Sequence, residues 1–264
     1  MGKACILAFM LNLFNQEVFT RYKSPNQRIR VMSEAWFGRR MFCPACNSDS
    51  LNVYPNNRAV FDFFCPSCDE KYQLKSQSKD IKGTVPDGAY GTMMDAVKSG
   101  RVPNFFFLHY RKEDYTIQNL LLVPRFFFSE SIIQKRNPLS DTARRAGWTG
   151  CNLLFKNLAE EGKIRVIDSC SELPKEMVRE SWKKVGFLQE LNQSKRGWIN
   201  DIIWCIDKVG KIEFSLSELY PFENHLKSLH PENNNIQPKI RQQLQILRDK
   251  GFLTFIGPGR YRRK

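Results

Sequence analysis

Two pairs of cysteines constrain the fold of this chain more than any other feature. Cys43 and Cys46 form one C-x2-C pair in MFCPACN, and Cys65 and Cys68 form a second in FFCPSCD, with eighteen residues between the pairs. Each C-x2-C turn directs two sulfurs to one point, and four thiolates at this spacing suit a tetrahedral Zn²⁺. Because four protein ligands leave no open position, we expect a structural zinc site. Two redox pairs or free thiols are the alternative.

The other four cysteines are isolated: Cys5, Cys151, Cys170 and Cys205. This pattern is typical of a reduced, cytoplasmic, metal-binding protein rather than a disulfide framework. The N-terminal segment CILAFMLNLF is apolar, but its roughly ten residues are too few to span a bilayer. We therefore expect it to pack on the core as a strand or helix, with no membrane association. Met10 is a second candidate start of the chain.

Composition supports a folded core and a polyanionic partner. Of the 264 residues 42% are hydrophobic, including twenty Phe, so the chain does not resemble a disordered tail. The formal net charge is +14. Such a charge favours binding to a polyanion such as nucleic acid, although many basic chains bind none.

Residues 1–191 alternate between strand and helix patterns, which predicts an α/β core. The run SPNQRIRVMSEAWFGRR predicts a helix capped by Ser24. KYQLKSQ and IRVID predict strands, and the continuously apolar runs PNFFFLHY and NLLLVPRFFF predict strands buried on both faces. VPDGAYGTMMDAVKSG predicts a turn followed by an amphipathic helix. The polar stretch LNQSKRG, residues 191–197, predicts a linker.

Residues 192–264 predict a second domain, a winged helix. GWINDIIWCIDKV, LSELYPFENHLKSL (opened by Ser215 or Ser217) and IQPKIRQQLQILRDKG (closed by Gly251) predict three helices, and FLTFIGPGRYRRK predicts a hairpin. The stretch from Lys239 to Lys264 contains eight Lys or Arg and a single acidic residue. A basic third helix and wing indicate DNA binding, whereas a winged helix that contacts protein is usually less basic.

Asp62, Gln73 and Lys75 surround the second cysteine pair in a pattern typical of metal-dependent nucleases. Residues separated by one lie on the same face of a strand, so Gln73 and Lys75 would project together while Asp62 enters from a neighbouring strand. We expect Asp62 and Gln73, with the Leu74 carbonyl, to ligate Mg²⁺, and Lys75 to position the attacking water. The D-x10-Q-x-K spacing alone is weak, but a zinc knuckle and a winged helix beside it strengthen the interpretation.

Several ordered stretches carry a resemblance to a known family. They are CPAC, FFCPSC, NNR-x-V-x-D, LKS, DGAY-x-TMM, PNFFFL, SIIQ, TARRAGW-x-GCN, RGW and IRQQLQILRDK. The chain resembles the DpnI-like, methyladenine-dependent restriction endonucleases over nearly its whole length, except about ten N-terminal residues. The resemblance implies an α/β PD-(D/E)XK nuclease core with a four-cysteine zinc knuckle and a C-terminal winged helix. It also implies type II hydrolysis of double-stranded DNA at N6-methyladenine GATC sites, with both domains recognising the site.

The chain departs from that family at Gln73, where the family carries Glu. A glutamine oxygen can ligate a metal but contributes no charge, so Mg²⁺ would be held in a weaker field. Glu70 lies on the opposite strand face, and Asp69 lies about 13 Å along an extended strand, so neither replaces the missing carboxylate. Branches of the wider nuclease superfamily carry Q-x-K and are active. Two alternatives stay open: a non-cleaving reader of methylated DNA, and a nuclease of altered sequence or methylation specificity.

Further residues are candidates for DNA contact with a monomeric protein. In TARRAGWTGCN the Trp148 ring would contact a methyl group, and the neighbouring arginines would contact phosphate or guanine. A core position for Trp148 is the alternative. On the third helix glutamines could contact adenine, and wing arginines would hold phosphates. The full set is Arg144, Arg145, Trp148, Lys239, Arg241, Gln242, Gln245, Arg260, Arg262 and Arg263.

Overall fold

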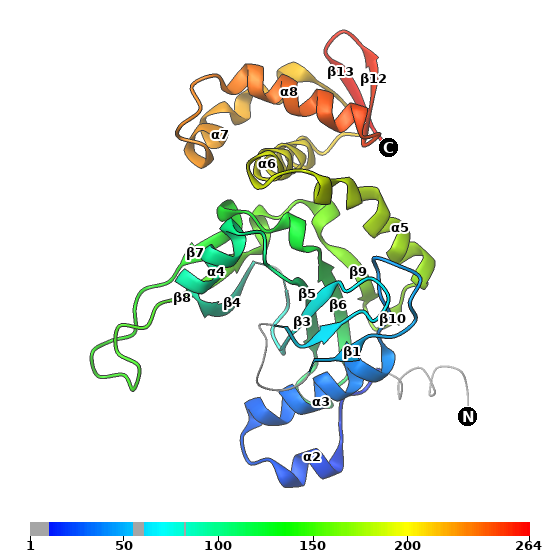
Figure 1. The fold of residues 1–264 in the computed structure, drawn as a ribbon, viewed down its shortest axis with the longest axis vertical. Helices are drawn as coiled ribbons and strands as arrows, with labels where there is room; N and C mark the ends of the chain where they lie inside the picture. The colour runs from blue at the N-terminus through cyan, green and yellow to red at the C-terminus, as the bar shows by residue number, and fades with distance from the viewer. Residues whose placement is uncertain (1–10, 55–60, 82) are drawn as a thin grey trace. The chain divides into compact units, whose positions relative to one another are not determined.

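The computed structural model describes residues 11–54, 61–81 and 83–264, which form two compact units (Figure 1). The first unit comprises the described residues up to 81 together with Val102–Arg125 and Gly162–Lys183. The second comprises Gly83–Arg101, Phe126–Glu161 and Lys184–Lys264. Met10 and most of the N-terminal apolar segment lie outside the described residues. The domain boundary between residues 191 and 192 stays a prediction.

A seven-stranded sheet forms the centre of the first unit, in the order β1-β2-β3-β5-β6-β9-β10. β3 and β5 are parallel, and the other neighbouring strands are antiparallel. Parallel neighbours need a crossover connection, which residues 78–103 provide. The strands are β1 (Asn52–Val53), β2 (Phe63–Phe64), β3 (Lys71–Gln77), β5 (Asn104–Tyr110), β6 (Ile117–Val123), β9 (Ile164–Asp168) and β10 (Ser171–Glu172).

The structure confirms two of the predicted strands, KYQLKSQ and PNFFFLHY, and only part of a third, NLLLVPRFFF. β3 and β5 lie at their predicted residues, and the three phenylalanines of β5 are 1% exposed each, which confirms burial on both faces. The prediction of one strand through NLLLVPRFFF is partly wrong, because β6 ends at Val123 and Arg125–Phe127 form a 3-10 turn. Pro124 has no N–H to donate to a sheet ladder and interrupts the strand there.

Three helices accompany this sheet: α2 (Gln16–Arg21), α3 (Pro25–Arg40) and α5 (Lys175–Val185). α3 begins after Ser24, as predicted. The Phe37 ring contacts Phe63 and Phe106 with centroid separations of 4.6 and 4.8 Å, so this helix packs on the sheet. Leu11 and Leu13 are buried, as expected for the described end of the N-terminal apolar segment.

The second unit contains a three-stranded sheet, β4-β8-β7, formed by Thr84–Ala89, Gly150–Leu154 and Ile133–Lys135. Helix α4 (Tyr90–Lys98) follows β4 directly. The predicted turn at VPDGAY is wrong, because these residues pair with β8 and Val85 is buried. The single-turn 3-10 helices Glu130–Ile132, Phe155–Asn157 and Glu160–Gly162 and the longer Gly186–Glu190 connect the other elements.

The C-terminal residues confirm the predicted three helices and hairpin. The elements are α6 (Gln193–Val209), β11 (Glu213–Ser215), α7 (Glu223–Leu229), α8 (Ile236–Asp249), β12 (Leu253–Gly257) and β13 (Arg260–Arg263). The strands form a sheet in the order β11-β13-β12, and the β12–β13 hairpin lies beside α8 (Figure 1). Gly251 follows α8 with a φ of 75°, a conformation that favours glycine. None of the described helices is long and apolar enough to span a bilayer.

Two local predictions in this region are wrong. The expected linker at residues 191–197 is the start of α6, because the Asn192 side chain accepts the Lys195 N–H at 3.0 Å and caps the helix. The predicted second helix begins instead as two 3-10 turns, Leu216–Glu218 and Tyr220–Phe222. Ser215 and Glu218 form a capping box there, and Pro221 lacks the N–H that a continuous helix needs.

Asn104 is a fully buried polar residue at the start of β5. Its amide nitrogen donates to the Lys71 carbonyl at 3.0 Å and to the Glu70 carboxylate at 2.7 Å. Its amide oxygen accepts the Arg125 N–H at 2.8 Å. One side chain therefore joins the start of β3, the start of β5 and the residue that begins the 3-10 turn after β6.

Asn104→Ala is expected to lower the free energy of unfolding by about 1–3 kcal/mol, because it leaves buried polar groups without partners. Urea unfolding of the whole protein measures this loss. Asn52→Ala, at an exposed position of β1, is the matched control and should change stability by no more than about 0.5 kcal/mol. Equal unfolding midpoints for the two variants would contradict a structural role for Asn104.

Candidate metal centre and candidate active site

The four cysteines of the two C-x2-C pairs gather in the first unit. Their sulfurs all lie within 4.8 Å of one another, with 3.6 Å between Cys43 and Cys68 and 3.5 Å between Cys46 and Cys65. Zn–S bonds of about 2.3 Å place tetrahedral sulfurs about 3.8 Å apart, whereas a disulfide requires about 2.05 Å. The four thiols are free. The predicted cluster is confirmed, and its geometry fits a zinc ion.

Backbone N–H groups favour negative charge on one sulfur of each cysteine pair. Ser48 N–H donates to Cys46 Sγ and Ser67 N–H donates to Cys65 Sγ, each at 3.4 Å. Burial disfavours ionisation of Cys65, but the N–H donors of Cys68 and Ser67 outweigh it and lower its pKa to about 7. Burial raises the pKa of the Cys43 and Cys68 thiols. Thiolates are the form that binds Zn²⁺, so metal binding would release the protons of these two thiols.

α5 holds the first cysteine pair from outside the cluster. The Arg179 guanidinium donates to the Ser48 carbonyl at 3.0 Å and to the Cys43 carbonyl at 3.3 Å. It also pairs with Asp49 at 3.1 Å, and Lys175 pairs with the same carboxylate at 2.9 Å. These contacts orient the first knuckle relative to a helix that lies more than 120 residues later in the chain.

Asp62 lies beside the open edge of β3. β2 is so short that it pairs only with Lys71 and Tyr72, which leaves the next part of that edge without a strand partner from β2. There the Asp62 carboxylate accepts the Leu74 N–H at 2.8 Å, while the Asp62 N–H donates to the Tyr72 carbonyl at 3.0 Å. The carboxylate therefore lies at the residue between Gln73 and Lys75.

The β3 backbone arranges the other predicted residues around this point. In a strand the N–H and C=O of one residue point to the same side, so the Leu74 carbonyl also points toward the edge that Asp62 occupies. Gln73 and Lys75 share one face of β3. The Gln73 side chain has no hydrogen bond with the described part of the chain. The metal roles of Asp62, Gln73 and Leu74 stay predictions.

The electrostatics of Asp62 reflect its surroundings. Burial raises the pKa of this carboxyl, and the Leu74 N–H and the positive charges of Lys75 and Arg30 partly oppose the increase. Arg30 lies on α3, where it pairs with Glu34 at 2.7 Å. Ionisation of Asp62 therefore costs free energy, and a cation bound beside the carboxylate would reduce that cost. A carboxylate that ligates a divalent metal has this property.

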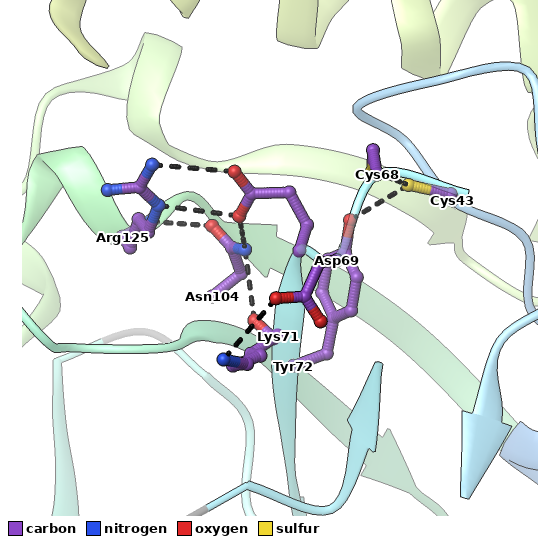
Figure 2. Close-up of polar contacts among 8 residues, drawn as sticks. Cys43, Cys68, Asp69, Lys71, Tyr72, Asn104 and Arg125 are labelled. Atoms are coloured by element: carbon purple, nitrogen blue, oxygen red, sulfur yellow. Dashed lines mark hydrogen bonds and ion pairs between the residues drawn. The ribbon is translucent and has the colours of Figure 1, made fainter. Parts of the chain in front are cut away.

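A network that sequence reasoning missed controls the start of β3 (Figure 2). The Glu70 carboxylate accepts from Asn104, and Arg125 donates to it at 3.3 and 3.4 Å. Asp69 is exposed and pairs with Lys71 at 3.6 Å. Both acids are thus engaged away from Gln73. No local pattern reveals this network, because Arg125 follows Glu70 by 55 residues.

The loop between β7 and β8 carries the first group of predicted DNA contacts and projects from the small sheet of the second unit (Figure 1). Trp148 is half-buried, so its ring is only partly accessible, and its contact with DNA stays a prediction. The Arg145 guanidinium lies 4.7 Å from its ring centroid, and Arg144 is exposed. A Cβ on Gly150 would lie 2.9 Å from the Trp148 ring, so that glycine lets the ring approach β8.

On α8 the exposed face contains Arg241, Gln242 and Gln245, whereas Leu244 and Leu247 are buried as expected. Arg241 donates to the Tyr220 hydroxyl at 3.2 Å. The Lys239 ammonium donates to Gln242 at 2.8 Å and lies 5.6 Å from the Trp198 ring centroid.

The three wing arginines differ in their surroundings. Arg260 is exposed at the start of β13. Arg262 is exposed and pairs with Glu213 at 2.7 Å. Arg263 is half-buried and pairs with Glu161 and, at 2.7 Å, with Asp207. Their contact with DNA stays a prediction, and Arg263 has the least accessible charge of the three.

Two family models match the chain. Residues 10–191 match the model described as DpnI, Dam-replacing family, and residues 194–263 match the model described as DpnI_C, Dam-replacing HTH domain. Together they span the candidate metal centre, the candidate active site and the C-terminal helices and hairpin.

Asp62→Asn is expected to raise the melting temperature in EDTA at pH 7. An acid whose folded pKa is raised destabilises the fold once it ionises, so the gain should grow with pH above the unfolded pKa and vanish at low pH. Scanning calorimetry across pH measures it. Asp114→Asn is a control of opposite sign, because Arg111 holds the Asp114 pKa well below its usual range. A lower melting temperature for Asp62→Asn would contradict the assignment.

Proposed function

Because the chain belongs to the Dam-replacing (DpnI) family, we propose that it hydrolyses double-stranded DNA at GATC sites that carry N6-methyladenine, with Mg²⁺ as the catalytic ion. Membership of this family implies a methylation-dependent restriction endonuclease. The target sequence, the methyl position, the metal and the type II class are the proposal. So is the assignment of residues 1–191 as a PD-(D/E)XK nuclease domain and 192–264 as a winged-helix domain.

One observation supports the chemistry above all: the Asp62 carboxylate accepts a hydrogen bond from Leu74, the residue between Gln73 and Lys75. The carboxylate oxygen of Asp62, the side-chain oxygen of Gln73 and the carbonyl of Leu74 would hold the ion. Bound there, Mg²⁺ would polarise the scissile phosphate and make the attacking water more acidic. Lys75 orients that water and neutralises charge that develops on the phosphate.

Recognition of the methyl group needs more than one contact. The N6-methyl of adenine points into the major groove, where a helix can read it. Burying one methyl contributes about 0.8 kcal/mol, roughly fourfold in affinity. Two methyls in a palindrome, each read by two domains, multiply this preference, and an unfilled pocket adds a penalty.

The second unit offers two kinds of surface for such reading. Trp148 with its stacked Arg145 presents an apolar ring beside a cation, and Arg144 is exposed nearby in sequence. The exposed glutamines of α8 offer amide groups to base edges. We assign Arg260 and Arg262 to phosphate contacts, because both are exposed on the wing.

A reader of methylated DNA that does not cleave is the second candidate function. Gln73 brings no charge to the metal, while Glu70 is bound to Asn104 and Arg125, and Asp69 to Lys71. The negative field at the candidate active site is therefore weaker than two carboxylates would make it. A nuclease that cleaves a different sequence or methylation state is the third candidate.

The deciding experiment is digestion of one GATC-rich plasmid, prepared with and without adenine methylation, in Mg²⁺, Mn²⁺ and EDTA. We expect cleavage of the methylated plasmid alone, and only with metal. Lys75→Ala should reduce cleavage about 100-fold or more and still retard methylated DNA in a gel, because Lys75 serves chemistry. Cleavage of both plasmids would reject methyl specificity. Retardation without cleavage by the unaltered protein would favour the reader.

Gln73→Glu is expected to lower the Mg²⁺ concentration needed for half-maximal cleavage, because it restores a carboxylate to the metal. Titration of Mg²⁺ against initial cleavage rate measures the change. Gln77→Glu is the matched control: it adds the same charge to the same face of β3, about 13 Å further along. An unchanged metal requirement in Gln73→Glu would show that Gln73 is not a ligand, and cleavage gained only by this variant would favour the reader.

A further inference from the structure

Tyr72 connects the four-cysteine cluster to the strand that carries Gln73 and Lys75. It precedes Gln73 on β3, so its ring lies on the opposite face of that strand. The side chain is 0% exposed, and its ring lies 5.5 Å from that of Phe106. Its hydroxyl lies 3.1 Å from Cys43 Sγ, as Figure 2 shows.

The direction of this hydrogen bond follows from the state of the sulfur. A cysteine that ligates zinc is a thiolate and has no proton to donate, so the phenol must be the donor. A hydrogen bond to a charged acceptor is stronger than one between neutral groups. The contact between Tyr72 and Cys43 is therefore stronger when the cluster holds a metal than when Cys43 is a neutral thiol.

The Tyr72 backbone extends the same connection to Asp62. Its carbonyl accepts the Asp62 N–H at 3.0 Å, and two residues later the Leu74 N–H donates to the Asp62 carboxylate at 2.8 Å. Cys65 N–H donates to the Glu70 carbonyl at 2.9 Å, which closes the knuckle between β2 and β3. One residue thus touches a candidate zinc ligand with its side chain and the candidate active site with its backbone.

We propose that Tyr72 is a positioning residue whose hydroxyl donates to the Cys43 thiolate and thereby couples metal occupancy of the four-cysteine cluster to the placement of β3. Loss of the metal would loosen β3, which carries Gln73 and Lys75 and contacts Asp62. The catalytic consequence rests on the proposed function, whereas the coupling between cluster and strand does not.

The test compares Tyr72→Phe with Tyr110→Phe in the full chain. Tyr110→Phe removes a hydroxyl from another buried tyrosine of the same sheet, on β5. Co²⁺ is used in place of zinc, because its sulfur-to-metal charge-transfer absorption reports electron density on the thiolates. Loss of a hydrogen-bond donor should move this absorption to longer wavelength in Tyr72→Phe and leave it unchanged in Tyr110→Phe. An unshifted absorption in Tyr72→Phe would overturn the assigned hydrogen bond.

Two further readouts test the coupling itself. Competition with a chelator should show metal affinity about tenfold or more weaker in Tyr72→Phe, the usual effect of removing a partner of a metal ligand. Amide hydrogen exchange of Leu74 should be faster in metal-loaded Tyr72→Phe than in the unaltered, metal-loaded protein. A shifted absorption with unchanged exchange at Leu74 would overturn the coupling.

The unaltered protein provides a test that does not depend on any variant. Stripping its metal should accelerate Leu74 exchange, and reloading should restore protection. If exchange is the same with and without metal, the coupling is wrong. All these readouts are independent of DNA cleavage, so a protein that fails to cleave methylated plasmid would reject the proposed function and still decide the role of Tyr72.

Discussion

The arrangement of the first unit depends on the meeting of four cysteine sulfurs within 4.8 Å of one another. Two of them follow α3, and two lie in the turn between β2 and β3. Thiols this close attract one another only weakly, whereas a divalent cation bound by four thiolates contributes folding free energy directly. A cross-link of this kind would set the path of the chain from β2 into β3. The residues on either side of it are those that matter for the proposed chemistry.

Side chains bind the first residues of β3, whereas its edge beside Leu74, where the proposed chemistry would occur, has no strand partner from β2. Asn104, Glu70 and Arg125 bind its first residues, and Tyr72 faces the cysteine cluster. β2 begins only at Phe63, opposite Tyr72, and does not reach the position opposite Leu74, so a carboxylate rather than a strand satisfies that N–H. Burial of this carboxylate is costly. The cost is compatible with a group that exists to bind a cation, since a bound metal would offset it.

Net charge overstates the number of cations available to DNA. Arg262 and Arg263 of the wing both pair with acids of the second unit, and Arg145 stacks on Trp148. Pairing on an exposed surface contributes little to stability and is easily exchanged for a phosphate. The half-buried pair of Arg263 with Asp207 is more costly to exchange, because both groups would lose a partner away from water. Arg262 is therefore more available to a phosphate than Arg263. The difference comes from position within the fold rather than from residue type.

The sequence by itself determined features that depend on short-range patterns. These are the two cysteine pairs, the limits of β3 and β5, the start of α3 after Ser24, and the succession of three helices and a hairpin at the C-terminus. Even there, the polar run at residues 191–197 suggests a linker although Asn192 caps α6, and the turn pattern at VPDGAY forms β4. Polarity and turn-forming residues describe local preference, which pairing with β8 and a helix cap can override.

Only the tertiary structure decided which groups meet. Cys43 and the Tyr72 hydroxyl are 29 residues apart, Glu70 and Arg125 are 55 apart, and Glu161 and Arg263 are 102 apart. No periodicity or motif spans such separations in a single sequence. The alternation of side chains along β3 already placed Gln73 and Lys75 on one face. The contact of Asp62 with Leu74, however, required the short β2 and the turn with Cys65 and Cys68 that follows it. Side-chain partners over such distances are set by the packing of whole elements, which is a property of the folded chain.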